Sequence, residues 1–278
     1  LTGSRKHLDL LRDQAETLAR EIDESPHGWI EDYPGECYPV DVLGAIVAIH
    51  EADAVLGTDR SAFVRRAFRA FEKECLDRSV NLPPYSASVR TGRPSSPSRG
   101  CGNSYAIWLC TRVWPEVAQR WMDLYVQHFW QRRWLFDGFR EWPSHLPGND
   151  WYADVDSGPV VAGHGFAACA FGLAAARATG RFDLARPLAT EALATSWPLP
   201  WGTLLTPRLL SNATDAPYLG EAAMLWVLVQ QPRPGVPART GGAVSGYVFV
   251  LLGVYLGFGS LLVVRAVRRV RLLWSGRV

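Results

Sequence analysis

Two kinds of apolar segment alternate along the chain. In the first kind, apolar residues recur every three or four positions and so line one side of a helix; these segments are 8–22, 63–75, 117–128 and 184–192. In the second kind, apolar and small residues fill nearly every position; these segments are 40–56, 104–113, 159–178 and 219–230. A one-sided stripe predicts a helix with an exposed face, and an apolar surface all round predicts a buried helix. The alternation predicts an all-α domain of helical hairpins, each joining an inner helix to an outer one.

The links between these helices differ in length in a regular way. Each inner helix is followed by a short link, at 57–59, 114–115 and 180–181. The links that lead into inner helices are long, at 25–38, 77–103, 135–157 and 198–217. In an antiparallel array all long links fall at one end, which we call the rim. Long loops in a compact helical domain are usually functional or disordered, so we expect the functional site at the rim.

The last apolar segment of the chain is different, because no charged residue interrupts it. Between Arg239 and Arg265 the chain carries no charge, and residues 246–264 are almost wholly apolar. As a helix this stretch is about 28 Å long, close to the roughly 30 Å of bilayer hydrocarbon. We therefore predict a transmembrane helix within residues 244–264; the alternative is a buried core helix.

The residues around this predicted span indicate its orientation. The tail, 265–278, holds five arginines and no acidic residue, so the positive-inside rule places it in the cytoplasm. Residues 1–231 then form an extracytoplasmic domain, joined to the cell membrane through a Pro- and Gly-rich linker at 232–243. Such a domain needs an export signal or an earlier span, which we expect before Leu1. Gly253 and Gly257 have the Gly-x-x-x-Gly spacing that permits close helix contact, and so suggest a homo-oligomer.

Charge and cysteine content exclude several classes of protein. The first 238 residues hold all 27 acidic residues and 23 of the 29 basic ones, a net charge of −4. A domain with this charge is not expected to bind nucleic acid. The cysteine spacing matches no metal site, and the chain has no Gly-rich phosphate loop, dinucleotide fingerprint or Gly-x-Ser-x-Gly elbow. We therefore predict no cofactor and no metal.

Three loop motifs precede inner helices, and they carry a family resemblance. The motifs are Tyr33-Pro34-Gly35-Glu36, Gly100-Cys101-Gly102-Asn103-Ser104 and Asp154-Val155-Asp156-Ser157-Gly158-Pro159. With the hairpin pattern, they make residues 1–231 resemble the α/α-toroid proteins of the six-hairpin glycosidase-like and linalool dehydratase/isomerase-like type. The resemblance implies a ring of hairpins, here an incomplete one. The catalytic residues of neither group match this chain position by position, so the resemblance assigns none.

Carboxylates in the rim loops are the main catalytic candidates. Acid/base catalysis needs one protonated and one ionised carboxyl group, and we predict Asp154 and Glu36 as this pair. A loop salt bridge is the alternative role for Glu36. Asp156 precedes Pro159, a residue favoured in a first helical turn, so Asp156 either caps that helix or takes part in catalysis.

Several further rim residues have a possible role in the chemistry. We predict that Tyr33 or His164 orients the substrate, although a histidine on a buried helix is more often a core residue. Glu221, near the start of the last inner helix, is a further substrate-binding candidate. Cys37 and Cys101 each precede an inner helix and are expected to lie close together. They would form a disulfide in an oxidising compartment, or one would act chemically, as thiols are suspected to do in the dehydratase-like relatives.

Aromatic residues are frequent in the same loops, and four of them are substrate-binding candidates: Trp29, Tyr38, Trp142 and Trp151. Such rings stack on sugar faces or enclose an isoprenoid chain. Their alternative role is to cover the hydrophobic core beneath the loops. Together these features predict a membrane-anchored acid/base enzyme, either a glycan hydrolase or lyase or a dehydratase-like enzyme on a lipid alcohol. The alternative is a non-catalytic toroid that binds a glycan or a protein at the cell envelope.

Overall fold

The computed structural model describes residues 5–72, 75–133, 135–147, 150–197 and 204–275. Its helices follow the predicted order closely. They are α1 (Leu8–Glu24), α2 (Pro39–Leu56), α3 (Ser61–Phe68) with a 3-10 turn η1 (Arg69–Phe71), α4 (Gly100–Val113), α5 (Pro115–Phe129), α6 (Phe166–Ala178), α7 (Phe182–Thr195), α8 (Leu205–Ala213), α9 (Leu219–Val229) and α10 (Gly246–Trp274).

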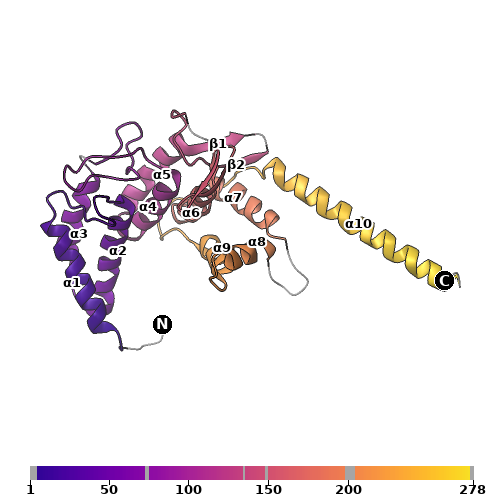
Figure 1. Ribbon diagram of the computed structural model, residues 1–278, viewed down its shortest axis with the longest axis horizontal. Coiled ribbons are helices and arrows are strands. Elements are labelled where there is room, and N and C mark those ends of the chain that lie inside the picture. The colour runs from indigo at the N-terminus through magenta and orange to yellow at the C-terminus, as the bar shows by residue number, and fades with distance from the viewer. Residues whose placement is uncertain (1–4, 73–74, 134, 148–149, 198–203, 276–278) are drawn as a thin grey trace.

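The predicted packing order of the helices is confirmed, but the prediction that 219–230 is a buried helix was wrong, since only Gly220 and Val227 of α9 are buried. The inner helices α2, α4, α6 and α9 pack against one another in that order. Helices α1 and α3 pack on α2, α5 on α4, α7 on α6, and α8 on α9. Figure 1 shows the result as a curved row of hairpins, whose ends at α1–α2 and at α8–α9 lie apart. The long links between α1 and α2, α3 and α4, and α5 and α6 contact one another, so they lie at the same ends of the helices and form the rim.

The domain is mostly helical, but the prediction that it is all-α was wrong in and around the third long link. Strands β1 (Trp130–Arg133) and β2 (Phe136–Phe139) form an antiparallel hairpin there. Strands β3 (Trp151–Asp154), β4 (Gly158–Val161) and β5 (His164–Gly165) form a second, three-stranded sheet. Both sheets are small, and they cover the rim ends of α5 and α6.

The predicted start of the third inner helix was also wrong, because residues 159–165 are extended. Val161 pairs with His164 across a two-residue turn. Both turn residues have positive φ, 51° at Ala162 and 85° at Gly163. This is the combination that a type I′ hairpin turn requires, and it ends any helix that Pro159 would begin. As a consequence Asp156 lies in the turn between β3 and β4 and caps no helix, and His164 lies on a strand.

The link predicted at 198–217 contains a short helix, α8, within its described part. Its apolar face packs on α9, where Gly220 lies so close to Pro207 that a Cβ atom would overlap the Pro207 carbonyl. The Ser211 hydroxyl accepts from the Gly220 amide at 2.9 Å and donates to Glu221 at 2.6 Å. The sequence suggested an irregular link here. These contacts instead stabilise α8, a helix of the domain that was not predicted.

Helix α10 includes the predicted span and continues ten residues beyond it, to Trp274. It is the one described helix that is long and apolar enough to cross a membrane, and little of it is buried. The linker before it is packed on the domain. The Arg239 amide donates to the Gly180 carbonyl at 2.8 Å, and the Arg239 carbonyl accepts from the Asp183 amide at 2.9 Å. The linker therefore runs along the turn between α6 and α7.

Candidate functional site

A single arginine at the rim connects two of the long links. Arg99 directly precedes α4, and its side chain is 5% exposed. Its Nε donates to Oε1 of Glu141 at 2.8 Å, and its Nη2 donates to Oδ2 of Asp154 at 2.8 Å. Because both nitrogens belong to one guanidinium group, the two carboxyl groups lie within the upper limit of about 9.5 Å seen for paired glycosidase carboxylates.

Backbone hydrogen bonds fix the position of this arginine. The Gly100 amide donates to the Glu141 carbonyl at 2.8 Å, and the Glu141 amide donates to the Gly163 carbonyl at 3.0 Å. The hydroxyl of buried Tyr125 donates to the Gly100 carbonyl at 3.0 Å. A Cβ atom at Gly100 would overlap the carbonyl oxygen of Arg140. The start of α4 and the segment after β2 are therefore locked together, with Arg99 and Glu141 on either side of the contact.

Aromatic rings enclose the guanidinium. Its central carbon lies 4.6 Å from the ring centre of Tyr85 and 5.1 Å from that of Trp142. Both distances are within the range of cation–π attraction, which favours the charged arginine. The Trp142 indole donates to the Tyr152 hydroxyl at 2.9 Å, which extends the aromatic wall to β3.

The two carboxylates of this cluster have opposite electrostatic environments. Glu141 is fully buried, and burial raises its pKa more than Arg99 lowers it. Its Oε2 has no hydrogen-bond partner in the described part of the chain. Burial also acts on Asp154, but hydrogen bonds from Ser157 and the charge of Arg99 outweigh it and lower the Asp154 pKa. Such divergent pKa values are typical of acid/base pairs.

Asp154 is the exposed member of the pair. Its side chain is 36% exposed, and its Oδ1 accepts from the Ser157 amide and hydroxyl, both at 2.7 Å, and from the Asp156 amide at 3.1 Å. These bonds hold the turn after β3 and the carboxylate in one orientation. Solvent therefore reaches the arginine cluster on the Asp154 side.

Glu36, Tyr38 and Asp156 form a second part of the same rim. The Tyr38 hydroxyl donates to Oε2 of Glu36 at 2.8 Å, and the Tyr38 ring lies edge-on to Tyr85 at 5.1 Å. The Tyr85 hydroxyl in turn hydrogen-bonds to Oδ2 of Asp156. The loops before α2 and α4 thus meet the turn after β3, as the link lengths predicted. The predicted pair itself is separated, since Glu36 is exposed and connects to the Asp154 turn through two tyrosines.

The two cysteines predicted to lie close together have different neighbours. Cys37 is buried and its backbone pairs with that of Ala87; burial raises its pKa, and the charges of Asp32 and Cys75 raise it further. Cys101 is buried near Glu141; burial raises its pKa, and the charge of Glu141 raises it further. All five cysteines are free thiols, so the predicted disulfide is not formed.

The other predicted residues lie outside the arginine cluster. His164 lies against Gly138 and Phe136, and burial lowers its pKa. Trp29 is buried, edge-on to Phe71 at 4.8 Å, which is the core-covering alternative. Trp151 and Tyr33 are exposed at the rim, with Tyr33 edge-on to Tyr38 at 6.1 Å. Glu221 joins α9 to α8, as described above.

Two residues of the cluster, Arg99 and Glu141, were not predicted from the sequence. A signal exists for both, because each is a charged residue next to an apolar or small-residue segment in a long link. Two surface hollows of about 530 and 460 Å³ lie elsewhere, around Trp29 and around Trp108. Each is lined by a single carboxylate, Asp23 or Glu51, so neither offers an acid/base pair. The described residues also contain no cluster of three His, Cys, Asp or Glu side chains that fits a metal ion.

Comparison with known proteins adds nothing to this geometry, since no protein-family model and no curated protein sequence matches the chain.

Proposed function

We propose that this chain is an acid/base enzyme anchored in the cell membrane, with its domain on the extracytoplasmic side. It cleaves a neutral glycan at the rim of an open α/α-toroid. The observation that carries the proposal is a partly exposed carboxylate, Asp154, which Arg99 holds in one orientation, with a second exposed carboxylate, Asp156, on the same turn. Asp154 is held ionised and partly exposed, as a base or nucleophile must be. The rim loops that hold it come from three separate long links.

The roles of the neighbouring residues follow from their exposure. Glu141 is fully buried and contacts Arg99, so it is a positioning residue that fixes the guanidinium beside Asp154. Asp156 is exposed and accepts a hydrogen bond from the Tyr85 hydroxyl, and it lies two residues from Asp154 on the same turn. Asp154 accepts a proton from a water molecule whose oxygen attacks the anomeric carbon. Asp156, in its acid form, gives its proton to the leaving oxygen as the glycosidic bond breaks.

Charge and aromatic exposure support a neutral sugar as the substrate. Three exposed carboxylates, those of Glu36, Asp154 and Asp156, lie on the connected rim loops, so this part of the rim repels anions such as phosphates or uronic acids. Tyr33 and Trp151 present exposed rings of the kind that stack on sugar faces. A lipid alcohol would need an enclosed apolar channel, and the arginine cluster opens on polar groups.

A non-catalytic glycan-binding toroid is the second candidate. It is favoured by the hydrogen bonding of Asp154, since three bonds to Oδ1 and an ion pair to Oδ2 also serve to hold a turn. In this case the carboxylates accept hydrogen bonds from sugar hydroxyls and catalyse no reaction.

Replacing Asp154 by asparagine distinguishes these functions. We expect wild-type full chain in detergent to release reducing ends from neutral oligosaccharides of β-linked glucose or N-acetylglucosamine. Asp154→Asn should lower kcat by a factor of about 100 or more, because asparagine can neither accept a proton nor attack. The matched control is Asp59→Asn. Asp59 is an exposed carboxylate in the short link between α2 and α3, outside the rim loops, so this variant should keep full turnover.

Calorimetric titration with the same oligosaccharides completes the test. Binding by the wild type without turnover would support the second candidate and refute the enzyme. The absence of both binding and turnover would refute a neutral glycan as the ligand. Unchanged turnover in Asp154→Asn would remove Asp154 from the mechanism.

The membrane topology is tested separately with reporters. A reporter after residue 278 should be active only in the cytoplasm, because the basic tail stays inside. One inserted at Gly235, where a side chain would meet no other atom within 4 Å, should be active only outside. The reverse pattern would place the domain in the cytoplasm.

A further inference from the structure

The first third of α10 is in contact with the domain. The Tyr247 amide donates to the Leu135 carbonyl at 3.1 Å, and the Tyr247 ring lies 4.6 Å from Phe136. Further along the helix, the Tyr255 hydroxyl hydrogen-bonds to the Ala194 carbonyl, and its ring lies edge-on to Trp197 at 4.3 Å. The C-terminal end of α7 therefore lies beside the third turn of α10.

The position of Tyr255 in the span has a geometric consequence. Only nine residues separate Tyr255 from Arg265, the first charge of the tail, and they cover about 15 Å of helix. This is half of the roughly 30 Å of bilayer hydrocarbon. A spanning α10 must therefore hold Tyr255, and several residues before it, inside the bilayer. Whatever packs on Tyr255 lies at the depth of the outer leaflet.

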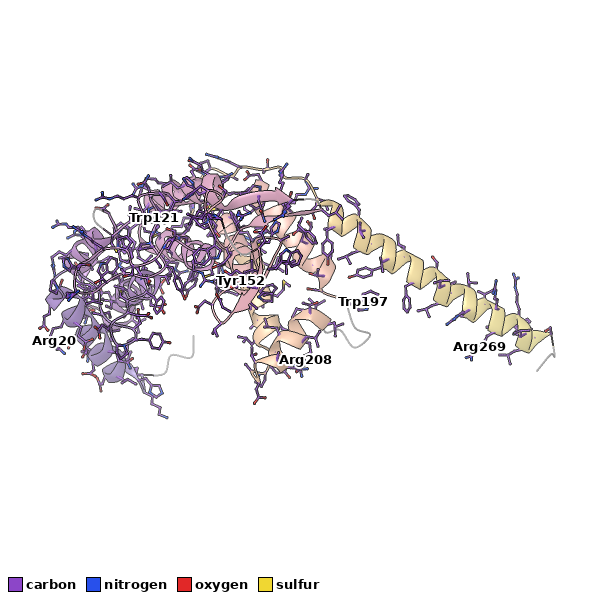
Figure 2. All side chains as sticks on the ribbon, turned by 45° about the horizontal axis from the view of Figure 1, so that its top comes forward. Arg20, Trp121, Tyr152, Trp197, Arg208 and Arg269 are labelled. Carbon is purple, nitrogen blue, oxygen red and sulfur yellow. The ribbon has the colours of Figure 1, made fainter. Side chains whose placement is uncertain are left out.

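The domain surface at this position is suited to lipid. The described residues at the end of α7 and the start of α8, 192–197 and 204–207, include no charged residue. Leu193 on α7 and Leu205 and Leu209 on α8 are exposed, and the two α8 residues share one helix face. Figure 2 shows Trp197 on the side of the domain from which α10 leaves, and Arg269 towards the far end of α10.

Several polar groups at the end of α7 and the start of α8 are hydrogen-bonded within the protein. The Leu205 amide donates to the Trp197 carbonyl at 2.8 Å, and the Thr206 hydroxyl donates to the Thr195 carbonyl at 2.7 Å. The hydroxyls of Thr195 and Ser196 donate to carbonyls one turn back in α7. Unpaired polar groups in hydrocarbon cost several kcal/mol each, so this bonding permits burial in lipid.

We infer that the end of α7 and the exposed face of α8 insert into the outer leaflet beside α10, with lipid acyl chains as their partner. This inference rests on the membrane anchoring proposed above and not on the enzymatic activity. It makes the domain a body docked on the bilayer in one orientation, in place of a domain on a loose tether. The linker, packed along the α6–α7 turn, is consistent with this docking.

Nitroxide labels at single introduced cysteines test the inference. Labels at Leu193→Cys and Leu209→Cys are compared with Leu10→Cys and Val55→Cys, in full chain reconstituted into phosphatidylcholine nanodiscs. Leu209 and Leu10 are well matched, at 56% and 54% exposed on outer helices. The wild type, with its five native thiols, measures background labelling. A label at Leu261→Cys reports whether α10 itself spans.

We expect labels at 193 and 209 to be several-fold more accessible to oxygen, relative to a nickel chelate, than labels at 10 and 55. Equal ratios at all four sites, with a membrane ratio at 261, would overturn the docking while leaving the anchor intact. A water-exposed label at 261 would refute the anchor itself. Dipolar broadening at 209 that disappears on dilution with unlabelled chain would show a second copy in place of lipid, and would also overturn the inference.

Discussion

Replacing Arg99 by methionine is expected to destabilise the domain by about 3–5 kcal/mol, because it leaves Glu141 buried without its charge partner. Glu141 has no exposed surface, and its Oε2 already lacks a hydrogen-bond partner among the described residues. Methionine fills much of the same volume between Tyr85 and Trp142, so the loss measures charge more than packing. Urea unfolding of the full chain in detergent, followed by circular dichroism, gives the free energy.

Two further variants show whether the stability lost in Arg99→Met comes from the unpaired buried charge. Arg66→Met removes an arginine whose partner, Asp23, is also half exposed, and should cost no more than about 1 kcal/mol. The double variant Arg99→Met with Glu141→Leu removes both buried charges and should recover most of the stability. If Arg99→Met costs no more than Arg66→Met, the buried pair does not hold the rim together.

The pH dependence of this effect has a definite sign. The folded-state pKa of Glu141 is raised, so its contribution to stability is fully present below its unfolded pKa of about 4.5 and is lost as pH rises through the folded pKa. Without Arg99 this loss should be larger, and Arg99→Met should recover stability on acidification to pH 5. Asp154 acts in the opposite direction. Its pKa is lowered, so its contribution is present above about 3.8 and is lost as pH falls further.

Replacing Gly100 by alanine is the second change for which we expect a large effect, a loss of about 1–3 kcal/mol or more. The new Cβ atom would overlap the Arg140 carbonyl oxygen and press on the Ala168 side chain. Backbone adjustment is restricted because the Gly100 amide and carbonyl are both hydrogen-bonded, to Glu141 and Tyr125. Relief of the overlap would move Arg99 away from Glu141.

Gly102→Ala is the matched control in the same helix. A Cβ atom there would meet only Val40, at 4.0 Å. Alanine is the better helix former, so this variant should be neutral or more stable by up to about 1 kcal/mol. Thermal unfolding of the two variants side by side is the measurement. Similar midpoints would show that the contact between α4 and the segment after β2 is loose.

The local features of the fold were predictable because they depend on periodicity along the chain. The one-sided stripe of α1 and the apolar surface of α2 each follow from residues within a few turns of one another. The same holds for α10, whose uncharged length alone predicts a span. The link lengths then placed the rim, since loops at one end of an antiparallel array must meet.

The strands at the rim were missed for a local reason. Residues 158–165 combine a proline, small residues and valines, which suit a buried helix start as well as a short strand. Helix or hairpin is decided here by two positive φ values, at Ala162 and Gly163, and alanine seldom adopts one unless its surroundings impose it. The error moved His164 from a helix to a strand and removed the capping role of Asp156.

The sequence by itself determined most of the helices and their order, the long apolar C-terminal helix and the end of the domain that carries the carboxylates. It also indicated Asp154 as a candidate. Only the tertiary structure decided that Asp154 is paired with Glu141 through Arg99 and that Glu36 stands apart. Arg99 lies 42 residues before Glu141 and 55 before Asp154. Their contact depends on how α4 packs against the segment after β2. Periodicity in a sequence predicts local helices and strands, but it does not predict which residues of two distant loops come into contact.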